Sequence, residues 1–377
     1  MRRICVVSGN RSDYARLKAI MAAIQAQRDL ELTLLVIGAH LLPDFGTTVE
    51  QIRRDGFPVF ATARTIIEGE DPASMSKSIG LGVMELTTLF DAVAPDIVVI
   101  SGDRFEILSA AVAASAMNIR LAHLQGGEVT GTFDESVRHS VTKLAHLHFP
   151  ATEGARERII RMGEAPEQVH LVGCPSIDII AKLPEVDRAR ICGTYRLDPI
   201  EPFLIVVQHP VTTEFQEAGD QMCLTLQAVE EVEMQGVMIY PNVDAGSERM
   251  VRAIRHMEQA NLLRRIHKYK HVPFEDFVHL MRHAAAIVGN SSAAIREGSF
   301  LGTPAVNVGT RQHRRERGKN VLDVSYDTYA IREAILQQVD HGPYPSDRLY
   351  GDGAAAPRVA QILSTSELGP LQKALSY

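Results

Sequence analysis

Short apolar runs alternate with amphipathic segments along the whole chain, and this alternation constrains the fold more than any other feature. In the segment Ser12–Gln27, Leu17 and Ile20 fall on one helical face and Ser12 is available as the N-cap. Strands that alternate with helices predict parallel, doubly wound sheets, so the expected fold class is α/β. The expected strands are Ile4–Ser8, Leu32–Ile37, Asp96–Ile100, Arg120–Leu124, His146–Phe149, Phe203–Val207, Val237–Tyr240, Ile266–His271, Ala285–Val288, Pro304–Val308 and Val321–Val324. Further expected helices are Met84–Val93, Ser109–Met117, Asp134–Ala145 and Phe274–Arg282.

The length and a pause in the alternation predict two domains. A chain of 377 residues has room for two domains of roughly 150 residues or more. Between about residues 181 and 202 the sequence is largely polar and contains three prolines. We therefore expect two Rossmann-like domains facing a cleft. Residues 1–180 form an N-terminal domain with the candidate catalytic carboxylates, and residues 181–377 form a C-terminal nucleotide-binding domain. The last segment, Ala354–Tyr377, is expected to be helical and to pack back on the N-terminal domain.

Charge and composition exclude several classes of protein. The net charge of -7 provides no basic field for nucleic acid, and the absence of Trp argues against an aromatic platform for bases. No stretch of 18 apolar residues occurs, so we expect no membrane span. The cysteines form no CxxC pair and match no usual zinc spacing, which predicts free thiols and no metal site. The basic N-terminus lacks a secretory apolar region, and we expect a cytoplasmic protein. The four cysteines are Cys5, Cys174, Cys192 and Cys223.

Polar and charged residues follow strand after strand at the predicted carboxyl edge of both sheets, where ligands of such sheets bind. Turns and helix caps explain part of this pattern, since they favour Gly, Ser and Asp. Turns and helix caps do not explain why charged or titratable residues such as Asp103-Arg104, Glu128 and His209 occur at these positions. The motifs are Gly9-Asn10-Arg11-Ser12-Asp13, Ser101-Gly102-Asp103-Arg104, Gln125-Gly126-Gly127-Glu128, Gln208-His209-Pro210, Pro241-Asn242-Val243-Asp244 and Gly289-Asn290-Ser291-Ser292.

The motif Gly289-Asn290-Ser291-Ser292 predicts a phosphate site, with simple serine capping of a helix as the alternative. It links a buried strand to a helix expected over Ala293–Phe300, and helix N-termini attract anions. Glu297 lies just over one turn further on, where a carboxylate can accept hydrogen bonds from a sugar diol. No GxxxxGK[ST] motif is present, and no GxGxxG follows the first strand. We therefore expect a nucleotide-diphosphate ligand and no nicotinamide cofactor.

Asp103, Glu128 and Asp134 are three carboxylates expected to converge on the N-terminal side of the cleft. Proton transfer at a sugar carbon needs such groups, with pKa values separated by their surroundings. His209 faces them from the other domain and can donate to a leaving phosphate. For Asp134 the alternative is a helix N-terminal carboxylate paired with Arg138 at i+4.

Two further clusters are weaker. His279 and His283 have metal-ligand spacing on a helix, but no third ligand is evident, so a surface pair is expected. Four arginines follow Gly309-Thr310 and predict either a nucleotide or effector contact from a cleft loop or a solvated loop. They are Arg311, Arg314, Arg315 and Arg317.

Together these motifs resemble the hydrolysing branch of the UDP-N-acetylglucosamine 2-epimerase family, which makes N-acetylmannosamine for sialic acid synthesis. The resemblance covers nearly the whole chain and looks closest to the epimerase half of the animal bifunctional epimerase/kinase, without the kinase half. Further motifs that carry it are Gly126-Gly127-Glu128-Val129-Thr130-Gly131-Thr132, Arg138-His139-Ser140-Val141-Thr142-Lys143-Leu144, Gly173-Cys174-Pro175-Ser176, Gly309-Thr310-Arg311-Gln312 and Tyr350-Gly351-Asp352-Gly353.

The resemblance implies the two-domain glycosyltransferase-B arrangement and a reaction that uses no cofactor and no metal. In that reaction the C2 proton and UDP are lost from UDP-N-acetylglucosamine to give 2-acetamidoglucal. Water then adds with inverted configuration at C2, which yields N-acetylmannosamine and UDP. The resemblance also suggests a homodimer or homotetramer.

The family's functional residues are carried over position by position. Many members have Glu where this chain has Gln125, so either Glu128 takes that acid/base role or the position is not obligatory. Arg252 and Arg255 match arginines that bind CMP-sialic acid, which predicts an effector site near an oligomer interface. The family's catalytic carboxylates match Asp103 and Asp134. The implied UDP contacts are Arg11, His209, Ser291, Ser292, Glu297 and Arg311, and Arg104, Gln125 and Asn242 are further candidate substrate contacts.

Several alternatives stay open on the sequence alone. The same chemistry could act on UDP-2,4-diacetamido-2,4,6-trideoxyglucose, because one pocket contact at C4 or C6 decides between the sugars. A non-hydrolysing epimerase would instead release UDP-N-acetylmannosamine. A glycosyltransferase on the same fold would need an acceptor site, and a nucleotide-sugar sensor would leave the acidic cluster without a function.

Overall fold

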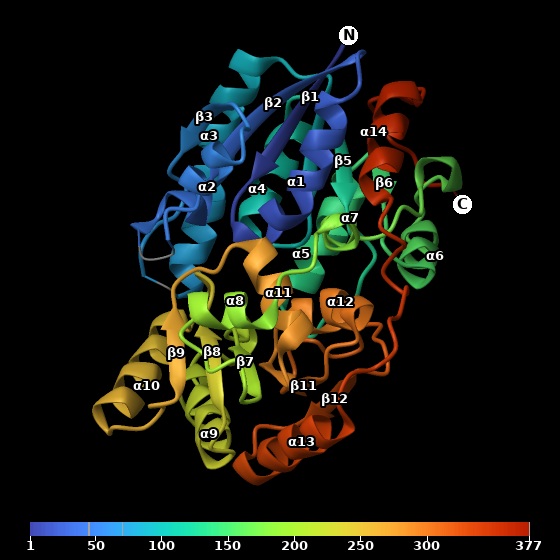
Figure 1. The fold of residues 1–377 in the computed structure, drawn as a ribbon. Helices are drawn as coiled ribbons and strands as arrows, with labels where there is room; N and C mark the ends of the chain where they lie inside the picture. The colour runs from blue at the N-terminus through green and yellow to red at the C-terminus, as the bar shows by residue number, and fades with distance from the viewer. Residues whose placement is uncertain (44–45, 70, 377) are drawn as a thin grey trace.

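The computed structural model describes residues 1–43, 46–69 and 71–376, and it has two lobes, each built on a six-stranded parallel sheet (Figure 1). The first sheet has the order β3-β2-β1-β4-β5-β6 and the second has the equivalent order β12-β11-β10-β7-β8-β9. Both are the doubly wound nucleotide-binding topology, so the predicted fold class is confirmed. The strands are β1 (Arg2–Ser8), β2 (Leu30–Ile37), β3 (Val59–Ala63), β4 (Ile97–Ser101), β5 (Arg120–Leu124), β6 (Leu147–Phe149), β7 (Phe203–Val207), β8 (Gln235–Ile239), β9 (Ile266–Tyr269), β10 (Ala286–Gly289), β11 (Ala305–Val308) and β12 (Val321–Val324).

Helices cover both faces of each sheet, and α13 lies at the far end of the C-terminal lobe (Figure 1). In the N-terminal lobe the helices are α1 (Arg11–Gln25), α2 (Val49–Arg54), α3 (Pro72–Val93), α4 (Phe105–Ala116), α5 (Phe133–Leu144) and α6 (Glu153–Arg161). The remaining helices are α7 (Pro175–Lys182), α8 (Arg188–Thr194), α9 (Ala218–Glu231), α10 (Ser247–Gln259), α11 (Phe274–His283), α12 (Ser292–Leu301), α13 (Thr328–His341) and α14 (Ala355–Thr365).

The central strands are apolar throughout because both of their faces are buried. In β1, Ile4 and Val6 pack into one hydrophobic cluster with α1 and α14. Cys5 and Val7 pack into another, on the opposite face, with α3 and α4. Alternate side chains of a strand point to opposite faces, so a strand covered by helices on both sides needs a continuous apolar run.

Helix α14 connects the end of the chain to the N-terminal lobe. It packs beside α1, and its Val359 and Leu363 belong to the same cluster as Ile4. Asp178 on α7 accepts hydrogen bonds from the main-chain N–H groups of Ala355 at 2.9 Å and Ala356 at 2.7 Å, which supplies the helix cap. The predicted domain boundary near residue 180 falls within α7 and stays a prediction.

Three local expectations were wrong or incomplete. Asn10, not Ser12, is the N-cap of α1: its side chain accepts from the main chain of Ser12 and Asp13, and Asp13 bonds back to the cap. Strand β3 was not predicted, because its residues are half exposed and include two alanines. The polar stretch before Phe203 contains the short helix α8.

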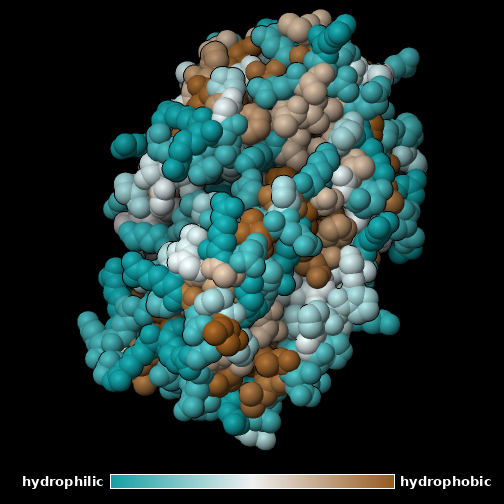
Figure 2. All heavy atoms as spheres, in the orientation of Figure 1, coloured by the Kyte–Doolittle hydropathy of each residue, from teal (hydrophilic) through white to brown (hydrophobic). Residues whose placement is uncertain are grey.

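On the face seen in Figure 2, hydrophobic residues lie in several groups among hydrophilic ones. Within the described residues, no helix is long and apolar enough to cross a membrane. The four cysteines are free, as predicted.

Candidate active site

Two adjoining pockets lie between the lobes, at the switch points where strand order reverses between β1 and β4 and between β7 and β10. The larger contains about 990 Å³ of empty space and the smaller about 490 Å³. Gly289 allows the close strand approach here, since a Cβ on it would lie 2.2 Å from the carbonyl oxygen of Val207. The residues common to both pockets are Ser12, Arg16, His209, Asn242, Ser291, Ser292 and Arg296.

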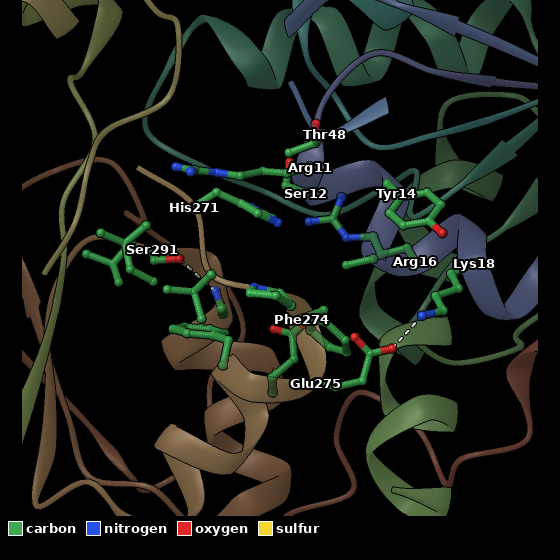
Figure 3. Close-up of a pocket in the computed structure, with 18 of the residues that line it drawn as sticks. Arg11, Ser12, Tyr14, Arg16, Lys18, Thr48, His271, Phe274, Glu275 and Ser291 are labelled. Atoms are coloured by element: carbon green, nitrogen blue, oxygen red, sulfur yellow. Dashed lines mark hydrogen bonds and ion pairs between the residues drawn. The ribbon is translucent and has the colours of Figure 1, made fainter. Parts of the chain in front are cut away.

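The larger pocket combines an apolar wall from the C-terminal lobe with polar atoms that have no partner. Figure 3 shows Phe274, His271 and Ser291 on one side and residues of α1 on the other. Both ring nitrogens of His271 are buried and unpaired within the described structure. Glu297 accepts from the Ser176 hydroxyl at 2.6 Å through Oε1, while its buried Oε2 is unpaired. A pocket of this kind suits a planar, hydroxyl-bearing ligand.

The N-terminus of α12 opens into both pockets. Ser291 is its N-cap and accepts from the main-chain N–H of Ala293 at 3.3 Å. Asn290, at the end of β10, bonds to the main-chain N–H of His209 at 2.7 Å and to its carbonyl at 2.8 Å, which fixes the two switch-point loops together. Because the N-terminus of a helix attracts anions through its main-chain N–H groups and its dipole, this end of α12 is a candidate anion site.

His209 is held as a neutral donor. Its Nδ1 accepts from the main-chain N–H of Asn242 at 3.2 Å, so the ring proton is on Nε2. Burial lowers the pKa of His209 well below its usual value, and the neighbouring Arg311 lowers it further. The neutral ring can therefore donate a hydrogen bond from Nε2 but carries no positive charge.

Arg16 was missed by the sequence analysis and lies at the junction of the pockets. It projects from the second turn of α1, is buried, and its Nε has no partner in the described structure. Burial lowers its pKa, as does nearby Arg296. An arginine without a fixed partner, beside an anion-binding helix end, is suited to phosphate. No motif marks it, because its importance depends on its burial.

Asp103 and Asp134 both line the smaller pocket and have opposite electrostatic surroundings. Burial alone would raise the pKa of Asp103, but the guanidinium of Arg138 and then that of Arg315 hold it well below its usual value. Burial raises the pKa of Asp134, and the negative charge of Asp103 raises it further, to about 6. Two carboxylates whose pKa values are driven apart are the arrangement expected of acid/base chemistry.

The predicted alternative for Asp134, pairing with Arg138, is wrong. Arg138 bonds to Asp103 and to the main-chain carbonyl of Glu128. The cation nearest Asp134 is Arg311 of the other lobe, with Nη2 at 3.6 Å from Oδ2. Asp134 therefore faces the cleft.

Glu128 and Gln125 line neither of the two pockets, although both are buried in the loop after β5. Glu128 is ion-paired with Arg296 at 3.1 Å and with Arg315. Gln125 adopts a left-handed backbone conformation (φ 62°), and its amide donates to the sulfur of Cys174 at 2.8 Å. The acid/base role considered for Glu128 stays a prediction; in this structure its carboxylate faces Arg296 and Arg315.

Arg11 and Arg104 line the pockets but bond across the lobe boundary. Arg11 donates to the carbonyl oxygens of Lys270 at 2.6 Å and Tyr240 at 2.7 Å. Arg104 is buried and bonds to Asp244 at 3.0 Å and Glu106 at 3.2 Å. Both arginines place positive charge near the anion site while they hold the lobes together.

The weaker clusters lie apart from this site. The expected surface pair is wrong for His279, which is buried on α11, whereas His283 is half-buried and bonds to a main-chain carbonyl. No group of three or more His, Cys, Asp or Glu that could hold a metal ion occurs among the residues described. The arginine run divides: Arg311 and Arg315 enter the smaller pocket, whereas Arg317 pairs with Asp323. Arg252 and Arg255 are exposed on α10, and the effector role inferred for them stays a prediction.

Comparison with known families identifies the chain's relatives. Residues 22–364 match the family model described as UDP-N-acetylglucosamine 2-epimerase. The chain belongs to this family. A UDP-N-acetylglucosamine 2-epimerase of Neisseria meningitidis is 33% identical over 97% of this chain and 96% of its own length. A UDP-N,N'-diacetylbacillosamine 2-epimerase (hydrolyzing) of Legionella pneumophila is 34% identical over 98% and 97%.

Solved structures of the same family share the fold. The UDP-N-acetylglucosamine 2-epimerase of Methanocaldococcus jannaschii, in complex with UDP-GlcNAc and UDP, aligns with a TM-score of 0.82 at 15% identity, over 96% of this chain and 99% of that one. A UDP-GlcNAc 2-epimerase from Neisseria meningitidis, solved with UDP-GlcNAc bound, aligns with a TM-score of 0.81 at 16% identity, over 96% of this chain and 99% of that one. The expected glycosyltransferase-B arrangement of the epimerase family is confirmed. Closeness to the animal bifunctional enzyme stays a prediction.

Proposed function

We propose that this family member is a hydrolysing UDP-N-acetylglucosamine 2-epimerase, which converts UDP-N-acetylglucosamine and water into N-acetylmannosamine and UDP. The observation that carries the proposal is the pair Asp103 and Asp134, which face an anion-binding helix end across one pocket. The smaller pocket, which holds this pair, adjoins the larger pocket, so the sugar, the diphosphate and the nucleoside of one UDP-sugar can each lie against complementary residues.

The nucleoside fits the larger pocket. The uracil ring would lie against the apolar wall around Phe274, where the unpaired nitrogens of His271 can bond to its polar edge. The free Oε2 of Glu297 is suited to accept a hydrogen bond from the ribose diol. These unsatisfied groups support a ligand with both an aromatic base and vicinal hydroxyls.

The diphosphate fits the junction of the pockets. Ser291, Ser292 and the N-terminus of α12 supply donors, and Arg16 supplies a charge without a fixed partner. The Nε2–H of neutral His209 completes the site from the end of β7. These groups stabilise the negative charge that develops when UDP leaves the sugar.

The first step is the elimination of UDP. The C1–O bond breaks with its electrons on the diphosphate, and the C2 proton passes to a carboxylate, which leaves a C1–C2 double bond. Asp134 is the better base, because its pKa of about 6 lies near neutrality. Asp103 stays ionised and stabilises positive charge that develops at C1.

The second step adds water to the double bond. The hydroxyl group joins C1 and a proton joins C2 on the face opposite to the one deprotonated, which gives N-acetylmannosamine. The atoms balance: one water supplies the hydroxyl at C1 and the proton at C2, and the proton that Asp134 took from C2 is released to UDP or to solvent. No step uses Gln125 or Glu128.

A single experiment tests the reaction and its alternatives. The protein is incubated with UDP-N-acetylglucosamine in deuterated water, and the products are read by NMR. Free N-acetylmannosamine with deuterium at C2, together with UDP, is the expected result. Deuterated UDP-N-acetylmannosamine without sugar release would instead assign the non-hydrolysing reaction, and absence of any exchange would contradict epimerase activity on this sugar.

The second candidate substrate is UDP-2,4-diacetamido-2,4,6-trideoxyglucose, with the same chemistry at C1 and C2. N,N'-diacetylbacillosamine is the common name of this sugar. The Legionella pneumophila relative, 34% identical over nearly the full length, is named as a hydrolysing 2-epimerase of its UDP form. Comparison of kcat/KM for the two UDP-sugars under identical conditions decides between them.

A further inference from the structure

Glu128 joins the two lobes behind the catalytic pocket. Its carboxylate, from the loop after β5, accepts from Nη1 of Arg296 at 3.1 Å and from Nη1 of Arg315. Both arginines belong to the C-terminal lobe, one on α12 and the other in the loop after β11, and all three side chains are buried. A buried charge that loses its partner is strongly destabilised, so this triad favours the closed arrangement of the lobes.

The triad is continuous with both halves of the site. On one side, Nη2 of Arg296 donates to the hydroxyl of Ser292 at 2.7 Å, at the start of α12. On the other side, the main-chain carbonyl of Glu128 accepts from Arg138 at 2.7 Å, and Arg138 holds Asp103. One residue thus connects the phosphate-binding serine with the carboxylate of the opposite lobe.

We propose that Glu128 is a positioning residue whose carboxylate, set between Arg296 and Arg315, keeps the lobes closed and brings Ser292 and Asp103 to one cavity. It moves no proton, because its oxygens are occupied by the two arginines and it lines neither pocket. The role rests on the proposed function for its substrate, but the closure itself does not require turnover.

The test compares Glu128→Gln with a matched control, Glu316→Gln. Glu316 also crosses the lobe boundary, where it accepts from the Thr152 hydroxyl at 2.7 Å and from Arg158 at 3.3 Å, and it lines neither pocket. UDP affinity is measured by calorimetry, closure by the change in radius of gyration on adding UDP, and turnover by kcat, KM and the pH profile.

Glu128→Gln is expected to weaken UDP binding at least tenfold, to lower kcat, and to enlarge the protein in the presence of UDP. The pH at which kcat/KM falls should not move. Glu316→Gln should stay within threefold of the unsubstituted protein in every measurement. Loss of turnover with unchanged UDP affinity would instead make Glu128 a proton carrier, and equal effects in both variants would make it an ordinary interface residue; either result overturns the proposal.

A variant that fails to fold does not end the test. If circular dichroism shows Glu128→Gln to be unfolded, Glu128→Asp replaces it, because the shorter carboxylate keeps the buried negative charge but draws back from Arg296 and Arg315, and the same criteria apply. The measurements of UDP affinity and of the radius of gyration require no turnover. If neither changes in the Glu128 variant, only the positioning role is contradicted. An unsubstituted protein that binds UDP but turns over no UDP-sugar contradicts only the proposed function.

Discussion

Arg138 directs two guanidinium nitrogens, Nε at 3.1 Å and Nη2, to a single oxygen of Asp103, Oδ2. No hydrogen bond from another described residue reaches Oδ1 of Asp103, which lines the smaller pocket. One oxygen is therefore fixed and the other is available to a substrate. This asymmetry keeps Asp103 negatively charged without blocking it.

Replacement of Asp103 by Asn should abolish turnover and leave UDP affinity within a few fold. The substitution keeps the shape of the side chain but removes the charge that stabilises C1, whereas the proposed UDP contacts are made by other residues, most of them on the other lobe. Turnover is measured by release of UDP, and affinity by calorimetry on the same preparation. Retained turnover in a folded Asp103→Asn protein would remove Asp103 from the chemistry.

The reaction should depend on ionisation of Asp134. Its pKa is raised to about 6 by burial and by Asp103, and a base is active only when deprotonated. Activity is therefore present above pH 6 and lost below it, and kcat/KM should fall about tenfold per pH unit on the acidic side. His209 adds no limb to the profile, because its pKa lies well below the usual value. A profile without an acidic limb near pH 6 would contradict this assignment.

Glu297→Gln should weaken UDP binding by about tenfold, or ~1.4 kcal/mol, since it removes a charged acceptor for the ribose diol. The contact with Ser176 can survive through the amide oxygen. The same variant should discriminate little between UDP and 2'-deoxy-UDP, which the unsubstituted protein distinguishes. If both proteins discriminate equally, Glu297 does not contact the ribose.

Gln125→Glu should destabilise the protein without increasing its activity. The side chain is buried against Cys174, and its amide oxygen already lacks a partner. A carboxylate there would lose a donor and bury a charge, at a cost of about 1–3 kcal/mol in the free energy of unfolding. Urea denaturation and steady-state kinetics measure both effects. A gain in kcat would show instead that an acid/base group at this position reaches the substrate.

The fold was largely predictable from the sequence because strands of parallel sheets are buried on both faces and appear as apolar runs. Strand β3 was not predicted because it is an edge strand, whose residues alternate in exposure and so form no continuous apolar run. The loops of the site were predictable as well, since the ends of parallel strands meet at one edge of a sheet.

The partners of the site residues were less predictable. Arg16 lies within a helix and belongs to no motif, so only its burial and its unpaired Nε reveal it. The arginines that hold Glu128 are 168 and 187 residues away in the sequence. Whether a carboxylate acts on substrate or on another side chain depends on such distant contacts, which spacing does not encode.

The most direct test of this account is a crystal structure of Asp103→Asn with UDP-N-acetylglucosamine bound. We expect the pyrophosphate at the N-terminus of α12 against Ser291 and Ser292, and C2 of the sugar next to the carboxylate of Asp134. A pyrophosphate remote from Ser291, or a sugar ring turned away from Asp134 and residue 103, would contradict it.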